Sequence, residues 1–224
     1  MNDGSAVRRV DGVAEAGPED FGLDLGVTVV VVTYNSSAVI GDCLRSLPAA
    51  LANLLHEIVV VDNDSSDDTL AVAHDALPSA TVIRLPVNAG YAAAINAGIN
   101  RADVRDAVLV LNPDVRLDPG AVVTLRAGLS DRVGVVVPRL VDEHGRPQPS
   151  LRREPTVARA LAEAVFIGAM SARLGLGETI VQPQRYEVEG DTDWATGAVM
   201  LINRACLDDV GLLDESFFLS LIHI

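Results

Sequence analysis

The chain has 224 residues, 49% of them hydrophobic, and its formal net charge is −14. This length allows one domain with a sizeable buried core, and the acidic balance argues against a broad surface for nucleic acid. The two cysteines, Cys43 and Cys206, lie far apart and give neither a disulfide framework nor metal-binding spacing, which is typical of a reducing cytoplasm. No apolar run reaches the roughly 18 residues that a membrane-spanning helix needs. We therefore expect a cytoplasmic protein that does not bind nucleic acid.

Predicted strands and helices alternate along the chain after residue 26. Residues 1–26 contain glycine and acidic residues without a secretory apolar segment, so we expect a flexible leader there. Apolar runs predict buried strands at 27–33, 57–61, 81–85, 108–111, 133–137 and 198–202. Apolar residues at helical spacing predict helices at 39–47, 65–76, 91–102, 119–129, 156–174 and 205–210.

Local signals define several ends of these helices. Pro48 is expected to end the first helix, on whose apolar face Cys43 is expected to lie in the core. Ser65 and Asp68 have the spacing of a capping box, and Pro119 suits the first turn of a helix. The alternation of buried strands with helices predicts an α/β fold with a mostly parallel central sheet and helices on both faces.

Three polar clusters follow successive predicted strands: Thr33-Tyr34-Asn35, Asp62-Asn63-Asp64 and Asn112-Pro113-Asp114. The carboxyl ends of parallel strands gather at one edge of the sheet, where open α/β sheets bind ligands. Pro113 cannot continue a ladder, and the side chains of Asn112 and Asp114 point the same way in extended backbone. Such oxygen donors suit Mg²⁺ or Mn²⁺ held together with substrate phosphates. The alternative is a simple Asx-Pro turn after a core strand.

The segment NAGYAAAINAGI at residues 88–99 follows the third predicted strand. Its small residues allow a helix N-terminus to approach a ligand closely, and free backbone N–H groups at such an end favour phosphate. Neither a GxGxxG fingerprint nor a GxxxxGK[ST] phosphate loop is present. The alternative for residues 92–94 is tight packing of helix on sheet, while the amide of Asn96 requires a partner.

Five sequence blocks occur in a characteristic order: VVVVTYNSSAVIGDCLRSL, EIVVVDNDSSDDT, NAGYAAAINAGI, LVLNPDV and WATGAVMLINRACLDDVGLLDESFF. In order and spacing they resemble family 2 glycosyltransferases over residues 27–218, and the loop at 138–156 resembles the rhamnosyltransferase-like branch. The resemblance implies a GT-A fold, a nucleotide-binding α/β sandwich. It implies inverting transfer of a sugar, rhamnose in that branch, from a nucleoside diphosphate sugar. The acceptor would be a hydroxyl in cell-surface polysaccharide or glycolipid synthesis.

The resemblance also assigns roles to individual residues. Donor-nucleotide binding falls to residues near the strand ends and in the small-residue segment: Thr33, Tyr34, Asn35, Asp62, Asn63, Asn88, Gly90, Asn96 and Asn112. Asn112-Pro113-Asp114 corresponds to the family's DXD motif, with asparagine at its first acidic position and Asp114 as the contact for Mg²⁺ or Mn²⁺. That cation would stabilise charge on the departing diphosphate. Trp194 and Gly197 match the segment that lines the acceptor side.

The family's general base has no counterpart in this sequence. It belongs to a Glu-Asp pair a few residues after the segment that matches Phe217 and Phe218, where this chain reads LSLIHI. We interpret residues 219–224 as a non-native tail translated from a common transposase sequencing adapter, CTGTCTCTTATACACATC. On this hypothesis the domain is incomplete at its C-terminus and the polypeptide is inactive, and the catalytic residue stays unknown. Resequencing the native locus tests it.

Two other readings of the function stay open at this point. The first is a catalytically silent, nucleotide-binding fragment. The second is a sugar-nucleotide pyrophosphorylase, a class whose glycine-rich N-terminal loop is replaced here by Tyr34-Asn35-Ser36-Ser37.

Five arginines form a local basic cluster in this acidic chain: Arg139, Arg146, Arg152, Arg153 and Arg159. One interpretation is a solvated loop and the start of a helix. The other is contact with an anionic diphosphate, such as that of a polyprenyl-linked acceptor, with peripheral attachment at the inner face of the plasma membrane.

Overall fold

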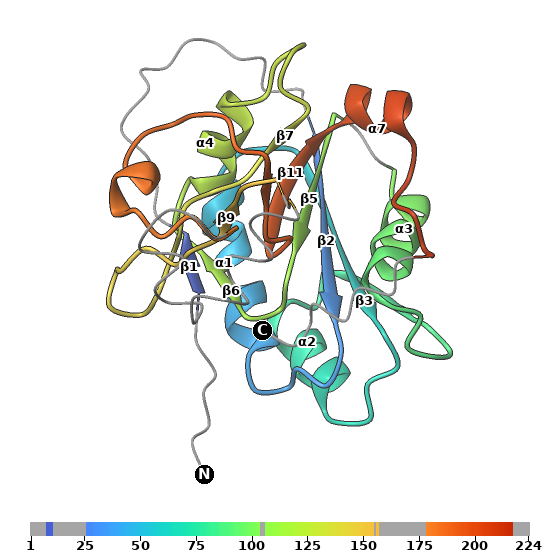
Figure 1. Cartoon of the computed structure of the whole chain (residues 1–224). Coiled ribbons are helices and arrows are strands. Elements are labelled where there is room, and N and C mark those ends of the chain that lie inside the picture. Colours follow the sequence, from blue (N-terminus) through green and yellow to red (C-terminus); the bar gives the residue numbers. More distant parts are fainter. Residues whose placement is uncertain (1–7, 11–25, 104–105, 155, 157–177, 217–224) are drawn as a thin grey trace. The chain divides into compact units, whose positions relative to one another are not determined.

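Six strands form the central sheet, in the order β4-β3-β2-β5-β11-β7 (Figure 1). Their bounds are β2 (Val27–Thr33), β3 (His56–Asp62), β4 (Thr81–Arg84), β5 (Ala107–Leu111), β7 (Val135–Val136) and β11 (Val199–Asn203). The first four in spatial order run parallel, whereas β11 is antiparallel to both β5 and β7. The predicted α/β fold with a mostly parallel sheet is confirmed. The strand pairing also fixes which polar residues meet at the sheet edge.

The computed structural model describes residues 8–10, 26–103, 106–154, 156 and 178–216. These divide into two compact units, of which unit 1 comprises Met1–Pro138 with Gly197–Ile224 and unit 2 comprises Arg139–Thr196. Residues 27–218 were expected to form one domain. The predicted helix at 156–174, which includes Arg159, and the tail at 219–224 lie outside the described residues. So does the leader, apart from residues 8–10 and 26.

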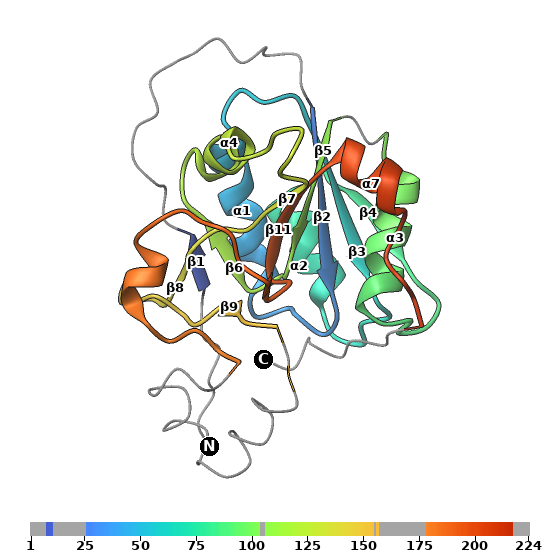
Figure 2. The same cartoon turned by 45° about the horizontal axis from the view of Figure 1, so that its top comes forward.

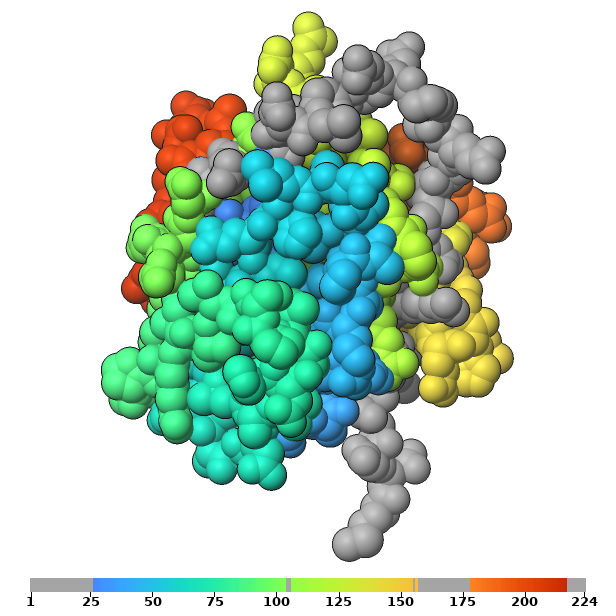
Figure 3. Space-filling view, turned by 180° about the vertical axis from the view of Figure 1, so that it is seen from behind, coloured from blue at the N-terminus to red at the C-terminus, as the bar shows by residue number. Residues whose placement is uncertain are grey.

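Helices cover both faces of the sheet in unit 1: α1 (Ile40–Leu51), α2 (Thr69–Ala76), α3 (Tyr91–Arg101), α4 (Ala121–Ala127) and α7 (Arg204–Val210). Figure 2 shows α3 and α7 on one side of the sheet and α1 and α4 on the other. The surface on the α1 side is visible in Figure 3, where α1 and α2 lie next to each other. No helix in the described part of the chain is both long and apolar enough to cross a membrane.

The core lies on both faces of strands whose residues are almost all apolar. All seven residues of β2 are buried, as expected for a strand covered on two sides. Val30 and Val32 face α3 and pack with Ile95 and Ile99 of that helix. Leu44 and Leu47 of α1 are fully buried, and so is Cys43, as predicted.

Helix α3 approaches the sheet so closely that one position requires glycine. A Cβ atom on Gly98 would lie 2.5 Å from Cγ1 of Val30 and 3.1 Å from Cγ2 of Val61. The predicted tight packing of this small-residue helix is therefore confirmed.

We expect Gly98→Ala to lower the free energy of unfolding by about 1–3 kcal/mol, because the added methyl group overpacks the helix–sheet contact. Urea unfolding followed by circular dichroism measures the change. Gly190→Ala is the matched control, because a Cβ there meets no atom within 4 Å. Equal stabilities for the two variants would contradict the close approach.

Several predicted boundaries differ from the structure for identifiable reasons. Pro48 lies inside α1, which continues to Leu51 because Ala50 and Leu51 are buried against the core. Here tertiary packing outweighs the cost of a proline within a helix. The capping box does not form: α2 begins at Thr69, and the Ser65 hydroxyl instead accepts a hydrogen bond from Asn35 N.

Two short strands of unit 1 were not predicted. Strand β6 (Val115–Leu117) directly follows the Asn112-Pro113-Asp114 turn, and β1 (Arg8–Val10) pairs with it in parallel. Residues 8–10 thus have a fixed partner within the segment that was expected to be a flexible leader. The strand predicted at 133–137 is reduced to the two residues of β7, and the helix predicted from Pro119 begins at Ala121 after Gly120 in a left-handed conformation (φ 74°).

Candidate functional site

The carboxyl ends of β2, β3 and β5 bring the predicted polar clusters to one edge of the sheet. Thr33 and Asp62 are direct register partners at the last positions of β2 and β3. Val31 pairs with Leu111, the last residue of β5, so the Asn112-Pro113-Asp114 turn leaves the sheet at the same edge. The predicted gathering of these three clusters is confirmed.

Asp62 is a fully buried carboxylate whose two oxygens have different surroundings. Its Oδ2 accepts a hydrogen bond from Ser65 N at 3.0 Å, whereas Oδ1 has no hydrogen-bond partner among the described residues. The hydroxyl oxygen of the adjacent Thr33 is likewise buried and lacks a partner within the described part of the chain. Leaving such groups unsatisfied costs about 1–3 kcal/mol each, so a ligand that donates hydrogen bonds here would bind favourably.

Arg84 lies beside this carboxylate, and the sequence analysis did not predict it as a site residue. It ends β4 in register with Asp62, and its Nε lies 3.8 Å from Oδ2 of Asp62. The same guanidinium lies 3.5 Å from Oδ1 of Asp64 and donates to the carbonyl of Ser65 at 3.0 Å. With 56% of its side chain exposed, it presents a positive charge at the sheet edge. The sequence signal that could have identified Arg84 is its position as a charged residue at the end of the third parallel strand.

Asn63 holds the loop that enters α3. Its side-chain amide donates to the carbonyl of Gly90 at 3.1 Å and accepts from Ala89 N at 2.9 Å. Asn88 accepts from Gly90 N at 3.1 Å, and Gly90 has a φ of 89°, a conformation that favours glycine. These contacts make Asn63 and Asn88 the residues that fix where the N-terminus of α3 lies.

The loops after β2 and β3 are joined by side chain–backbone hydrogen bonds. Asn35 has a φ of 48°, and its Oδ1 accepts a hydrogen bond from Ser66 N at 2.9 Å. The backbone N–H of Asn35 donates to the Ser65 hydroxyl at 2.8 Å. Ser37 N donates to Asp67 at 3.1 Å. Burial acts to raise the pKa of Asp67, but hydrogen bonds from Thr69 and Ser37 outweigh it and lower that pKa to about 2. The acidic turn therefore keeps residues 34–35 in place at the sheet edge.

The Asn112-Pro113-Asp114 turn is anchored on both sides. Asn112 N donates to the carbonyl of Ala198 at 2.9 Å, and the Asn112 carbonyl accepts from Val115 N at 3.4 Å. Burial, with a further contribution from the nearby negative charge of Asp114, raises the pKa of the Cys43 thiol to about 12. Within the described ranges no group of three His, Cys, Asp or Glu side chains could hold a metal alone.

Asn96 has structural partners in the segment that follows α7. It is 3% exposed, and its Nδ2 donates to the carbonyl of Leu213 and to Oε1 of Glu215, both at 2.8 Å. Its Oδ1 accepts from Leu213 N at 3.0 Å. These bonds use both hydrogens of its amide and its oxygen to hold residues 213–215, and the assignment of Asn96 to the donor nucleotide stays a prediction.

The two predicted acceptor-side residues belong to different units. Gly197, in unit 1, accepts at its carbonyl a 2.8 Å hydrogen bond from the Tyr91 hydroxyl. Trp194 lies in unit 2, in strand β10 (Trp194–Ala195), which pairs antiparallel with β9 (Leu151–Arg152). The Cζ atom of Arg152 lies over the Trp194 ring, 5.4 Å from the ring centroid. The Nε1 atom of Trp194 donates to the Arg153 carbonyl at 2.8 Å.

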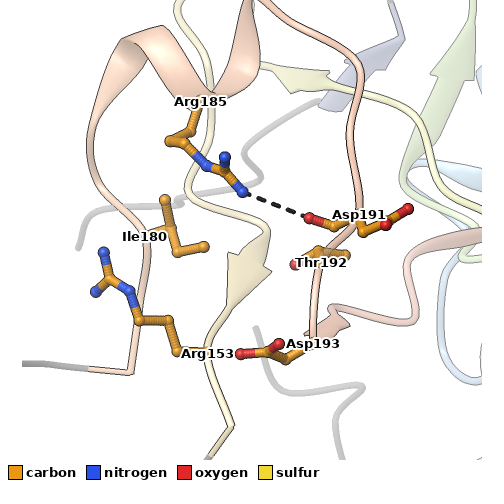
Figure 4. Close-up of a pocket in the computed structure, with 6 residues that line it drawn as sticks. All are labelled: Arg153, Ile180, Arg185, Asp191, Thr192 and Asp193. Carbon is orange, nitrogen blue, oxygen red and sulfur yellow. Dashed lines mark hydrogen bonds between the residues drawn. The ribbon is translucent and has the colours of Figure 1, made fainter.

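Unit 2 carries four of the five arginines of the predicted cluster, Arg139, Arg146, Arg152 and Arg153, and also contains β8 (Leu140–Val141) and the 3-10 helix η1 (Pro183–Tyr186). It has a polar pocket lined by Arg153, Ile180, Arg185, Asp191, Thr192 and Asp193 (Figure 4). The Arg185 guanidinium donates to the backbone carbonyl of Asp191 at 3.4 Å across this pocket. The pocket thus mixes two arginines with two carboxylates.

Comparison with known proteins finds relatives along most of the chain. The model of glycosyl transferase family 2 matches residues 28–173, more than half of the sequence. The N-acetylglucosaminyl-diphospho-decaprenol L-rhamnosyltransferase of Mycobacterium tuberculosis is 29% identical over 203 residues, 85% of this chain and 66% of that protein. A hexosyltransferase of low-salt glycan biosynthesis from Haloferax volcanii is 28% identical over 198 residues, 86% of this chain and 57% of that protein. The chain therefore spans less than two thirds of the length of either relative.

A solved structure shows the same fold. The mannosyltransferase PcManGT from Pyrobaculum calidifontis, in complex with GDP-Man and Mn²⁺, matches with a TM-score of 0.56 at 19% identity. The match covers 90% of this chain and 50% of that chain. The GT-A fold expected from the sequence is thereby confirmed.

Proposed function

Because the chain belongs to glycosyl transferase family 2, we propose that it serves inverting transfer of a sugar from a nucleoside diphosphate sugar to a hydroxyl acceptor. The observation that carries this proposal is the buried Asp62 carboxylate, whose Oδ1 has no partner among the described residues at the edge where three strands end. The relative from M. tuberculosis supports rhamnose as the sugar and a polyprenyl-linked diphosphate as the acceptor.

The nucleoside is proposed to bind at the ends of β2 and β3. An N–H group of the base would donate to Oδ1 of Asp62, and a second polar atom would meet the Thr33 hydroxyl. Arg84 holds the Asp62 carboxylate from the other side and keeps a positive charge close to the bound nucleotide. Tyr34 and Asn35 flank this place on the loop fixed by Ser65 and Ser66.

The diphosphate is proposed to lie between the α3 N-terminus and the Asn112-Pro113-Asp114 turn. Asn63 and Asn88 hold the backbone at Gly90, which leads into α3, so the N–H groups at the start of that helix can face phosphate oxygens. Asn112 and Asp114 provide oxygen donors that suit Mg²⁺ or Mn²⁺. When bound, this cation would act as a Lewis acid that neutralises charge on the leaving diphosphate.

Within unit 2, the acceptor is proposed to contact Trp194 and the arginines of that unit. Gly197 of unit 1 stays a separate predicted acceptor-side residue. Trp194 is 39% exposed, and an aromatic ring beside guanidinium groups suits a sugar or lipid diphosphate at a membrane surface. This part of the proposal includes peripheral contact with the inner face of the plasma membrane through Arg139, Arg146, Arg152 and Arg153, with Arg159 outside the described residues.

Calorimetric titration with dTDP and UDP, with and without Mn²⁺, tests the donor site. Metal-dependent binding of either nucleotide supports the proposal, whereas a folded sample without nucleotide affinity would rule it out.

Anionic vesicles test the acceptor side, and Trp194 provides an internal probe because it is the single tryptophan of the chain. We expect the double variant Arg152→Ala/Arg153→Ala to bind such vesicles more weakly by about 1 kcal/mol per arginine, roughly thirtyfold for the pair. Co-sedimentation measures the partition, and the Trp194 emission maximum of the wild type reports the contact.

The matched control for this experiment is Arg101→Ala/Arg132→Ala, which removes the same charge from exposed sites of unit 1. If both double variants lose the same affinity, the effect is one of net charge and the specific contact is disproved.

A further inference from the structure

Two side chains of α1 contact both ends of the turn that carries Asp114. The Cys43 thiol is directed at the carbonyl oxygen of Asn112, 3.7 Å away, and lies fully buried beneath the turn. The Ser46 hydroxyl accepts a hydrogen bond from Leu117 N at 3.1 Å and donates to the Cys43 carbonyl at 2.7 Å. Because residues three apart share one face of a helix, a single turn of α1 holds the backbone before and after Asp114.

Other contacts also hold this segment: Asn112 N donates to the carbonyl of Ala198, and β6 pairs with β1. The Asn112 carbonyl also accepts from Val115 N, which closes the turn on itself but does not attach it to the helix layer. Asp42 and Arg116 form an ion pair next to it. Both of these side chains are substantially exposed, so solvent screens the pair and its contribution is small. Cys43 and Ser46 therefore provide the shielded link between α1 and residues 112–117.

We infer that Cys43 and Ser46 are positioning residues, whose contacts with Asn112 and Leu117 set where the Asp114 carboxylate is presented to a cation. The part of this inference that concerns a cation rests on the proposed function. The part that concerns the position of the turn rests on the geometry alone. Neither side chain is assigned to the ligand itself: each acts on Asp114 through the backbone.

The first test compares nucleotide affinity with and without Mn²⁺ in Cys43→Ala, Ser46→Ala and the double variant. The ratio of the two dissociation constants measures the cation's contribution. We expect this ratio to fall about tenfold in the double variant, in line with other residues that orient metal ligands. The metal-free dissociation constant should stay unchanged within about twofold, because the nucleoside contacts at Thr33 and Asp62 are untouched.

The conservative variants Cys43→Ser and Ser46→Thr should restore the ratio, because a hydroxyl at 43 can donate to the Asn112 carbonyl and one at 46 can accept from Leu117 N. Cys206→Ala is the matched control, because it removes a thiol from α7, and it should leave the ratio unchanged. A double variant with the wild-type ratio would overturn the inference. So would a parallel loss of metal-free binding, since that result would show general damage to the fold.

Hydrogen exchange of the amides at 112–117 tests the positioning without any ligand. The amide of Leu117 should exchange faster in Ser46→Ala, because its acceptor is removed. If the wild-type chain shows no response to Mn²⁺, the proposed cation function fails, and the exchange result alone decides whether α1 fixes the turn. Unchanged exchange in the double variant would overturn the positioning.

Discussion

Asp62→Asn is expected to abolish most of the nucleotide affinity while leaving the protein folded. The amide has the size of the carboxylate and can still accept from Ser65 N, but it then presents an N–H group where the ligand also donates. Losing a hydrogen bond to a charged acceptor costs about 1.5–3 kcal/mol, which corresponds to roughly 10- to 100-fold in Kd. Calorimetric titration with UDP or dTDP measures the change.

Asp64→Asn is the matched control for this variant. It removes the same charge two residues away, from a side chain that faces Arg84, and asparagine tolerates the φ of 68° found there. We expect its Kd to stay within about threefold of the wild-type value, as for an exposed ion pair. Wild-type affinity in a folded Asp62→Asn protein would show that the base is recognised elsewhere.

Asp114→Asn is expected to remove the response of nucleotide binding to Mn²⁺. The substitution keeps the shape of the turn and its contacts with Val115 and Ala198, but takes away the carboxylate that a hard cation prefers. We expect Mn²⁺ affinity to fall by about tenfold or more, with the metal-free Kd for the nucleotide unchanged. Titrations at fixed nucleotide and increasing Mn²⁺ measure this.

The control for Asp114→Asn is Asp131→Asn, which removes one charge at an exposed position. A full Mn²⁺ response in Asp114→Asn, equal to that of the control, would exclude this carboxylate as a metal ligand.

The sheet and the edge at which polar residues gather could be predicted from the sequence because their signals are local. The run VTVVVVT has the composition of a strand buried on both faces, and all of its residues are buried. Polar residues directly after such strands must gather at the carboxyl edge of a parallel sheet. That rule predicts that the residues after β2, β3 and β5 share one edge, while the register pair Thr33 and Asp62 comes from the structure.

The partners of individual side chains could not be predicted, because they depend on contacts between distant segments. Asn96 has the pattern of a ligand-binding amide in a small-residue helix, yet its partners are Leu213 and Glu215. Ser65 has capping-box spacing but accepts from Asn35 across the neighbouring loop. For Ser65 a tertiary hydrogen bond replaces the predicted local one, and for Asn96 the partners come from a segment more than 100 residues away.

Other differences arise from competition between local preference and packing. Pro48 has the local properties of a helix terminator, but burial of Ala50 and Leu51 carries α1 onward. The role of Arg84 depends on the register between β3 and β4, which sequence spacing does not define.

The most direct test of the account is a crystal structure of the chain with UDP or dTDP and Mn²⁺, measured with anomalous scattering at the manganese edge. The account predicts an anomalous peak beside the Asp114 carboxylate, in contact with the diphosphate, and a base N–H group within hydrogen-bond distance of Oδ1 of Asp62. A nucleotide bound with its base away from Asp62, or a manganese peak remote from Asp114, would contradict it.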